Sequence, residues 1–315
     1  MQMRHLAGSP HAFVLGLLAR FNGLDWLHGE IMRVHILGSL LLSAAIAACA
    51  ASTAHASASP PVEAGQAQVR LLASGSSNTN SAPVFSGGVE IALNPGWKTY
   101  WRYPGDAGIP PRFDWSGSEN VTAVEVLYPA PKRITDGSGQ VSIGYEDNVI
   151  FPLRIRATDP AKPVRLKLKL DFATCEKICI PAEAVVALDV ATETPQEPAL
   201  KEALSRVPVP RKLGDAQLPA IVSVSVDRGK RPDGKDAQIL VTVNASSAAP
   251  LELFAEGPSE EWTIALPARV ERTGNFPVFS IPLDGARLGK TEVPPKIRLT
   301  LVSGVEAVEV DAPLD

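Results

Sequence analysis

The residues of this chain whose type and spacing could do chemistry are two cysteines, Cys175 and Cys179. They lie within Phe172–Pro181, at either end of a three-residue connection. Cysteines that face each other across a tight hairpin have Cβ atoms about 4.5–5.5 Å apart, and a disulfide needs about 3.5–4.5 Å. Little movement would therefore close a Cys175–Cys179 disulfide.

This disulfide could be a structural staple or a reversible redox switch. A staple is the usual role of a cysteine pair in an exported protein. However, closing a loop of about five residues stabilises a fold by only ~2 kcal/mol, and a chain of this length buries most of its surface without help. Lys177, between the cysteines, would favour a thiolate, whereas Glu176 opposes it. The residues alone leave both interpretations open.

The elements that must position the cysteines are strands. An alternating run at Val164–Ala173 leads into the motif and an apolar run at Ile180–Val190 leads out, which indicates a hairpin. Short strands with Gly, Pro, Asn and Asp turns predict an antiparallel β-sandwich over residues 65–195. The other expected strands are Gln66–Ala73, Val84–Leu93, Trp97–Arg102, Val121–Tyr128 and Asn148–Ala157, with Pro152 indicating an edge strand or bulge in the last.

The second half of the chain predicts a linker over 196–219 and a second, smaller β-sandwich over 220–315. A short amphipathic helix is expected at Pro198–Val207, with its proline near the start. The expected strands are Ala220–Val226, Ala237–Asn244, Leu251–Ala255, Trp262–Leu266, Phe276–Leu283, Lys296–Ser303 and Glu306–Val310. This half holds no cysteine or histidine, so it is expected to be a binding or spacer module.

Residues 1–56 have the pattern of a leader and signal peptide. Met32 is a plausible true start, because a short charged segment, the apolar stretch Ile36–Ala48 and an Ala-x-Ala cleavage signal ending at Ala56 follow it. Cys49 closes a sequence similar to a bacterial lipoprotein box, so lipidation at Cys49 is the alternative to cleavage after Ala56. Both interpretations predict export to the periplasm.

Cleavage after Ala56 would remove every histidine and methionine, which are His5, His11, His28, His35, His55, Met1, Met3 and Met32. No histidine-based catalysis, imidazole metal site or thioether copper site is then expected, and no cofactor is predicted. A net charge of −4 argues against a nucleic-acid partner. No apolar run after the leader approaches about 18 residues, so no membrane span is expected.

Two further segments could line a cysteine site. Asn94–Pro111 is crowded with aromatic residues, including Tyr100 and Trp101, and is either plain core or an aromatic wall that shields a thiolate. The loop Ile134–Gln140, which contains Asp136 and precedes Tyr145, is either a surface hairpin or a lid over the disulfide.

Three motifs in order carry a family resemblance: Gly96–Trp101, then Gly144–Tyr145 followed by Val149–Leu153, then Cys175 to Pro181 with Glu183. Residues 65–195 thereby resemble the amino-terminal periplasmic (alpha) domain of DsbD-type thiol:disulfide interchange proteins. The branch found in copper-sensitivity-suppressor ScsB proteins is the nearest in pattern, which suggests a link to copper tolerance.

The resemblance implies an immunoglobulin-like fold whose cysteine pair exchanges electrons with thioredoxin-like partners. It implies that Cys175 and Cys179 are the redox pair and that Cys179 forms the mixed disulfide. Tyr100 would line the site, and Asp136 would fall near an acidic position of a cap loop. The C-x3-C spacing is shorter than in the best-known members. The family's membrane domain is missing, so a separate membrane electron-transfer protein is expected as a partner.

The hypothesis that follows is a periplasmic thiol-disulfide oxidoreductase of the protein-disulfide reductase type. Its alternative is a non-catalytic envelope adaptor with a structural disulfide. A third option is Cu(I) held by the two thiolates, because Cu(I) prefers soft ligands. The reduction potential separates the first two, since structural disulfides lie below about −300 mV.

Overall fold

The computed structural model describes residues 57–314, apart from positions 80–81, 106–107, 138, 192–193, 195–196, 230–236, 247–248, 260–261, 263, 272–273 and 284–294. The expected leader, with Cys49 and the cleavage signal, lies outside the described residues.

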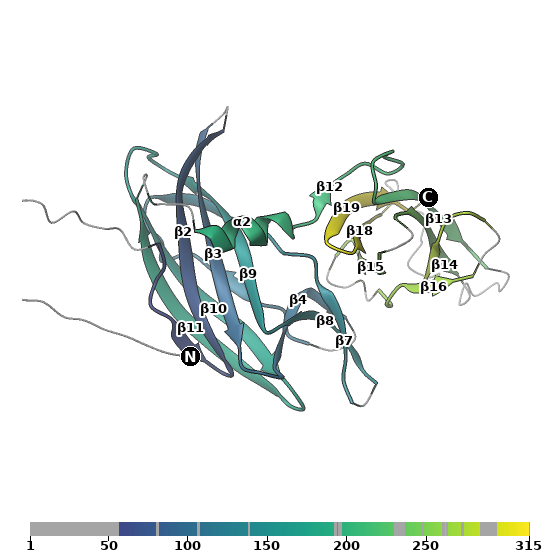
Figure 1. Ribbon diagram of the computed structural model, residues 1–315, viewed down its shortest axis with the longest axis horizontal. Coiled ribbons are helices and arrows are strands. Elements are labelled where there is room, and N and C mark those ends of the chain that lie inside the picture. The colour runs from purple at the N-terminus through teal and green to yellow at the C-terminus, as the bar shows by residue number, and fades with distance from the viewer. Residues whose placement is uncertain are drawn as a thin grey trace, which may run out of the picture. The chain divides into compact units, whose positions relative to one another are not determined.

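The first part of the chain forms two facing antiparallel sheets (Figure 1). One sheet has the order β1-β2-β3-β9-β6: β1 (Val62–Ala64), β2 (Ala67–Thr79), β3 (Ala82–Leu93), β9 (Asn148–Ala157) and β6 (Val121–Val126). The other has the order β11-β10-β4-β8-β7, with β5 beside β10: β11 (Cys179–Val190), β10 (Val164–Cys175), β4 (Lys98–Gly105), β8 (Val141–Glu146), β7 (Lys132–Thr135) and β5 (Arg112–Asp114). Alternating side chains from both sheets fill one hydrophobic core, as expected of a sandwich.

The C-terminal part forms two four-stranded sheets around a second core. One has the order β12-β19-β18-β15: β12 (Val209–Pro210), β19 (Glu306–Pro313), β18 (Lys296–Ser303) and β15 (Leu251–Glu256). The other has the order β13-β14-β17-β16: β13 (Ala220–Asp227), β14 (Gln238–Asn244), β17 (Val278–Pro282) and β16 (Ala268–Val270). The expected all-β class, a sandwich followed by a smaller one, is confirmed. The exact domain boundaries stay a prediction.

The helix α2 (Pro198–Ser205) follows the first sandwich and has its proline in the first turn, as expected. It packs against β9, across the face of the sheet in Figure 1. Leu200 is buried there against Gly88, where a Cβ would come within 2.4 Å of the leucine side chain. The absence of a side chain at Gly88 therefore lets the helix approach the sheet.

Two expectations about the strands are wrong. Pro152 lies on an interior strand, because β9 is flanked by β3 and β6, and it pairs in register with Gly88. Strand β6 ends at Val126, opposite Leu153, so little of the ladder is lost at Pro152. The run from Trp262 to Leu266 holds no strand among its described residues, and the Trp262 N–H donates to the Ser259 carbonyl instead of to a neighbouring strand.

Strand β4 makes the main polar contact with the second sandwich. The Arg102 guanidinium donates to the Glu256 carboxylate at 2.7 and 2.9 Å and also pairs with Glu309. Its Cζ lies 4.5 Å from the centre of the Trp101 ring, and that ring packs against Phe254 with centroids 5.8 Å apart. The strand that begins beside the cysteines is therefore anchored further along by partly buried charge pairs.

Candidate functional site

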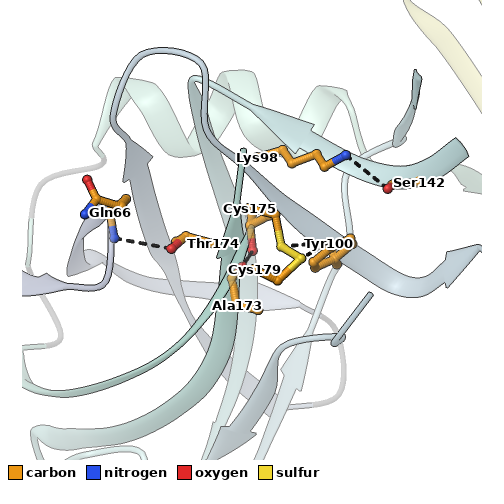
Figure 2. Close-up of a disulfide and its surroundings, with 9 residues drawn as sticks. Gln66, Lys98, Tyr100, Ser142, Ala173, Thr174, Cys175 and Cys179 are labelled. Atoms are coloured by element: carbon orange, nitrogen blue, oxygen red, sulfur yellow. Dashed lines mark hydrogen bonds between the residues drawn. A yellow bond between two sulfur atoms is a disulfide. The ribbon is translucent and has the colours of Figure 1, made fainter. Parts of the chain in front are cut away.

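The cysteines close a long hairpin, as the sequence predicted. Strands β10 and β11 pair without interruption from Val164 opposite Val190 to Cys175 opposite Cys179. A disulfide joins this last pair (Figure 2). The alternating buried and exposed side chains of β10 fix its register, because a one-residue slip would turn the whole apolar set outward. The core of the sandwich therefore sets where the disulfide lies.

The two sulfurs differ in exposure. Cys175 is 1% exposed, whereas Cys179 is an exposed residue on the other side of the turn. The turn residues Glu176, Lys177 and Ile178 are exposed, and Ile178 shows 68% of its surface to solvent. Cys179 is therefore the more accessible of the two cysteines, and it lies beside an exposed apolar side chain.

Tyr100 contacts both sulfurs. Its strand, β4, pairs with β10 at Lys98 opposite Cys175, which directs Tyr100 toward the disulfide. The phenol donates to Sγ of Cys175 at 2.8 Å, and its oxygen lies 3.2 Å from Sγ of Cys179 (Figure 2). A disulfide sulfur carries no hydrogen, so the phenol is the donor in both contacts.

Burial raises the pKa of Tyr100 above 10.0; a hydrogen bond with Ser142 lowers this pKa, and the charge of Asp136 raises it. The net direction is upward. The phenol is therefore protonated at neutral pH and remains a hydrogen-bond donor to sulfur.

Three residues near the sulfurs were missed by sequence reasoning. Lys98 is 7% exposed and its Nζ lies 3.2 Å from Oγ of Ser142, which is itself buried (Figure 2). Gly108 lies against the Tyr100 ring, where a Cβ would come within 2.4 Å of two ring carbons. Nothing in the sequence distinguishes this lysine from an exposed one, but the i, i+2 spacing of Lys98 and Tyr100 would have placed both on one face of a strand.

Trp101 and Tyr145, expected at the site, lie in the core of the first sandwich instead. Trp101 points to the opposite face of β4 from Tyr100 and is fully buried. Tyr145 packs edge-on against Phe151 and donates to the carbonyl of Pro129. These two residues fit the plain-core interpretation of the aromatic segments, because their described contacts are with the core and not with a sulfur.

Asp136 and Lys177 remain candidate site residues, for different reasons. Asp136 lies in the turn between β7 and β8, where its carboxylate accepts from the Gln140 N–H, and its charge acts on Tyr100. Its role in a cap over the disulfide stays a prediction. Lys177 is exposed at the hairpin tip, so it is placed to meet a partner.

The described part of the chain contains no cluster of three or more His, Cys, Asp or Glu side chains that could hold a metal ion. None of the helices described there is long and apolar enough to cross a membrane.

A solved structure, the N-terminal periplasmic domain of ScsB from Proteus mirabilis, resembles this chain with a TM-score of 0.61. The two are 21% identical, and the match covers 82% of this chain and 98% of that one. At this identity the likeness shows the fold. No curated protein matches the chain.

Residues 68–191 match the family described as thiol:disulfide interchange protein DsbD, N-terminal. This segment is therefore similar to the N-terminal domain of DsbD-type proteins. The match confirms the resemblance predicted from the sequence, and the immunoglobulin-like fold class with it. The DsbD-type segment covers less than half of the chain, but it contains both cysteines, Tyr100, Lys98 and Ser142. The match supports a thiol:disulfide interchange role for this segment, and the second sandwich lies outside it.

Proposed function

We propose that this protein is a periplasmic thiol:disulfide interchange protein that passes electrons through the Cys175–Cys179 pair to or from thioredoxin-like partners. The observation that carries the proposal is the asymmetry of the disulfide. One sulfur is exposed beside an apolar tip, and the other is buried under a phenol that donates a hydrogen bond to it. A staple needs neither feature.

The reaction begins when a partner thiolate attacks Sγ of Cys179. The Cys175–Cys179 bond breaks, a bond from the partner sulfur to Cys179 forms, and Cys175 leaves as a thiolate. A second partner thiolate then attacks the partner's own sulfur in this mixed disulfide. Cys179 is released, the partner becomes a disulfide, and the Cys175–Cys179 pair holds both electrons. Electron transfer to a partner is the reverse sequence.

Tyr100 stabilises the leaving group in this scheme. A thiolate that forms at the buried Cys175 cannot be solvated by bulk water, and a buried charge without a partner is costly. The phenol already lies 2.8 Å from that sulfur, so no rearrangement is required for it to donate to the thiolate. Because its pKa is raised, the phenol does so without losing its own proton at neutral pH.

The proposal also covers where the protein acts and which protein exchanges electrons with it. Residues 1–56 would direct export, with lipidation at Cys49 as the alternative end of the leader. A separate membrane protein would supply or accept electrons, because no membrane-spanning helix is found in the described residues. A role in copper tolerance follows from the ScsB-like pattern and is proposed on that ground alone.

The test is equilibration of the purified protein with glutathione buffers, followed by alkylation and mass measurement of the free thiols. An exchange-competent pair equilibrates in the folded state at a potential above about −300 mV. Cys175→Ser should then trap a mixed disulfide with a thioredoxin-like protein, and Cys179→Ser should not. A pair that resists reduction until the protein unfolds would instead identify a structural disulfide in an adaptor.

A further inference from the structure

Lys98 is a buried charged residue that the exchange scheme does not yet use. It is 7% exposed, and among the described residues its Nζ has one hydrogen-bond partner, Oγ of Ser142 at 3.2 Å. Burying an ammonium group is costly unless it is paired. This lysine lies two residues before Tyr100 on the same strand. Packing alone does not account for it, because a methionine would pack there at lower cost.

The donors and acceptors of Lys98, Ser142 and Tyr100 allow hydrogen bonds in one direction, from the lysine toward the sulfur. A lysine ammonium has three donors and no acceptor, so Ser142 must accept from Lys98. The Ser142 hydroxyl proton is then free to point to the phenol oxygen, and a hydrogen bond between these two side chains lowers the pKa of Tyr100. The phenol proton in turn points to the disulfide. With the Ser142 proton directed to the phenol oxygen, each donor would point toward the sulfur, and such chains polarise cooperatively.

The backbone holds the members of this chain in place. Tyr100 pairs with Gly144 across β4 and β8, and Ser142 lies two residues before Gly144 on the same face. A Cβ on Gly144 would come within 2.0 Å of the Thr99 carbonyl oxygen, so glycine allows the two strands to pair this closely. Figure 2 shows Lys98 reaching along the sheet to Ser142, with Tyr100 beneath both.

We propose that Lys98 and Ser142 are positioning residues that hold and polarise the Tyr100 hydroxyl, so that it stabilises the thiolate formed at Cys175 when the disulfide opens. This inference rests on the proposed function and adds two residues to its site. Lys98 supplies positive charge at the far end of the chain of donors, and Ser142 transmits it. The proton that Cys175 finally takes up comes from water.

Other charged groups surround the phenol and must be held constant. Asp136, in the turn between β7 and β8, opposes ionisation of Tyr100. Glu146 is opposite Lys98 on β8 and pairs with the exposed Lys132. Glu176 and Lys177 lie exposed in the hairpin turn. Because none of these is altered in the test variants, a change in the Cys175 titration can be assigned to Lys98 or Ser142.

The test is the pH titration of the Cys175 thiol, followed by thiolate ultraviolet absorbance. The background is Cys49→Ser with Cys179→Ser, which leaves Cys175 as the only cysteine of the three in the chain. Lys98→Met and Ser142→Ala should each raise the thiol pKa, which lowers the thiolate fraction at neutral pH about tenfold for one unit. Lys98→Arg should restore much of the effect, and Lys167→Met, which alters an exposed lysine of β10, should leave the titration unchanged.

The decisive arm is the combination with Tyr100→Phe. If Lys98 acts through Tyr100, then Lys98→Met should add nothing in the Tyr100→Phe background. Unchanged titrations in both single variants would overturn the inference, and so would equal shifts with and without the phenol. Circular dichroism verifies that each variant is folded, and Ser142→Ala keeps the test open if Lys98→Met does not fold. The titration does not require exchange, so a wild-type pair that fails to equilibrate with glutathione would overturn the proposed function separately.

Discussion

Gly108 lies flat against the ring of Tyr100: a Cβ built on this glycine would come within 2.4 Å of both Cδ1 and Cε1. The backbone at Gly108 also has a φ angle of +149°, which residues other than glycine rarely adopt. The phenol is therefore confined on one side by bare backbone and at its tip by the two sulfurs. This confinement makes the position of the hydroxyl sensitive to a single methyl group.

Gly108→Ala should displace the Tyr100 ring and slow reduction of the disulfide by glutathione by about tenfold or more, since a hydrogen bond to a charged group contributes about 1.5–3 kcal/mol. The matched control is Gly214→Ala, which also has positive φ (+77°) but has only an ordinary contact at 3.8 Å, with the Val222 carbonyl oxygen. The control should lose some stability to backbone strain and keep the wild-type rate. Equal rates in the two variants would show that the ring is not held by Gly108.

Ile178→Asp should separate partner docking from the chemistry at sulfur. Ile178 is 68% exposed and adjoins Cys179, so a protein partner that reaches the sulfur must cover it. Loss of an apolar contact worth more than 1 kcal/mol would slow exchange with a thioredoxin-like protein about fivefold or more. Glutathione is too small to need this surface, so its rate should stay near the wild-type value.

The comparison for this variant is Val305→Asp, which alters an even more exposed apolar residue (90%) in the turn between β18 and β19. Stopped-flow measurement of both exchange reactions gives the ratio of protein to glutathione rates. A ratio that falls for Val305→Asp as much as for Ile178→Asp would count against docking at the hairpin tip.

Tyr128 should contribute to loss of stability at alkaline pH. Burial raises its pKa to about 12; the nearby Arg102 lowers this pKa and Glu256 raises it. Below pH 10 the phenol is protonated in both the folded and unfolded protein, so its contribution to stability is complete. As the pH rises from about 10 to about 12, only the unfolded state ionises, and the contribution is lost. The loss is at most about 3 kcal/mol, from two units at ~1.4 kcal/mol each.

The measurement is the free energy of unfolding by denaturant at several pH values from 9 to about 12, for the wild type and Tyr128→Phe. Other ionising groups affect both proteins alike, so they cancel in the difference. The stability of the wild type relative to the variant should fall over this range. A difference that is independent of pH would show that burial does not hold Tyr128 in its neutral form.

Arg102→Met should lower the stability of the protein more than replacement of an exposed charged residue does. The Arg102 side chain is 22% exposed and its partners Glu256 and Glu309 are 17% and 20% exposed. Removal would leave two carboxylates close together in a poorly solvated place, and breaking buried pairs costs about 3–5 kcal/mol. Partial exposure places the expected loss near ~3 kcal/mol.

The paired variant is Arg154→Met, whose side chain is 59% exposed and whose partner Glu125 is 61% exposed. Solvent screening makes such a pair worth about 0–1 kcal/mol. Denaturant unfolding of both variants gives the comparison. Similar losses for Arg102 and Arg154 would mean that burial of the Arg102 cluster does not decide its contribution.

The amino-acid sequence by itself determined the local architecture of this protein. Alternation of apolar residues in Val164–Ala173 gave a strand with one buried face, and the short connection to Ile180–Val190 brought Cys175 and Cys179 into register. The same reasoning located α2 from its proline and located most of the long strands. Short elements such as β5 and β7 were missed, because three or four residues carry too little periodicity to be recognised.

The tertiary structure alone decided which side chains meet at the disulfide. Tyr100, Trp101 and Tyr145 look equivalent in the sequence, but the pairing of β4 with β10 turns Tyr100 toward the sulfurs and its neighbour into the core. The same pairing buries Lys98, and the β4–β8 register brings Ser142 beside it. Periodicity fixes the two faces of a strand, but only long-range pairing between strands decides what each face contacts.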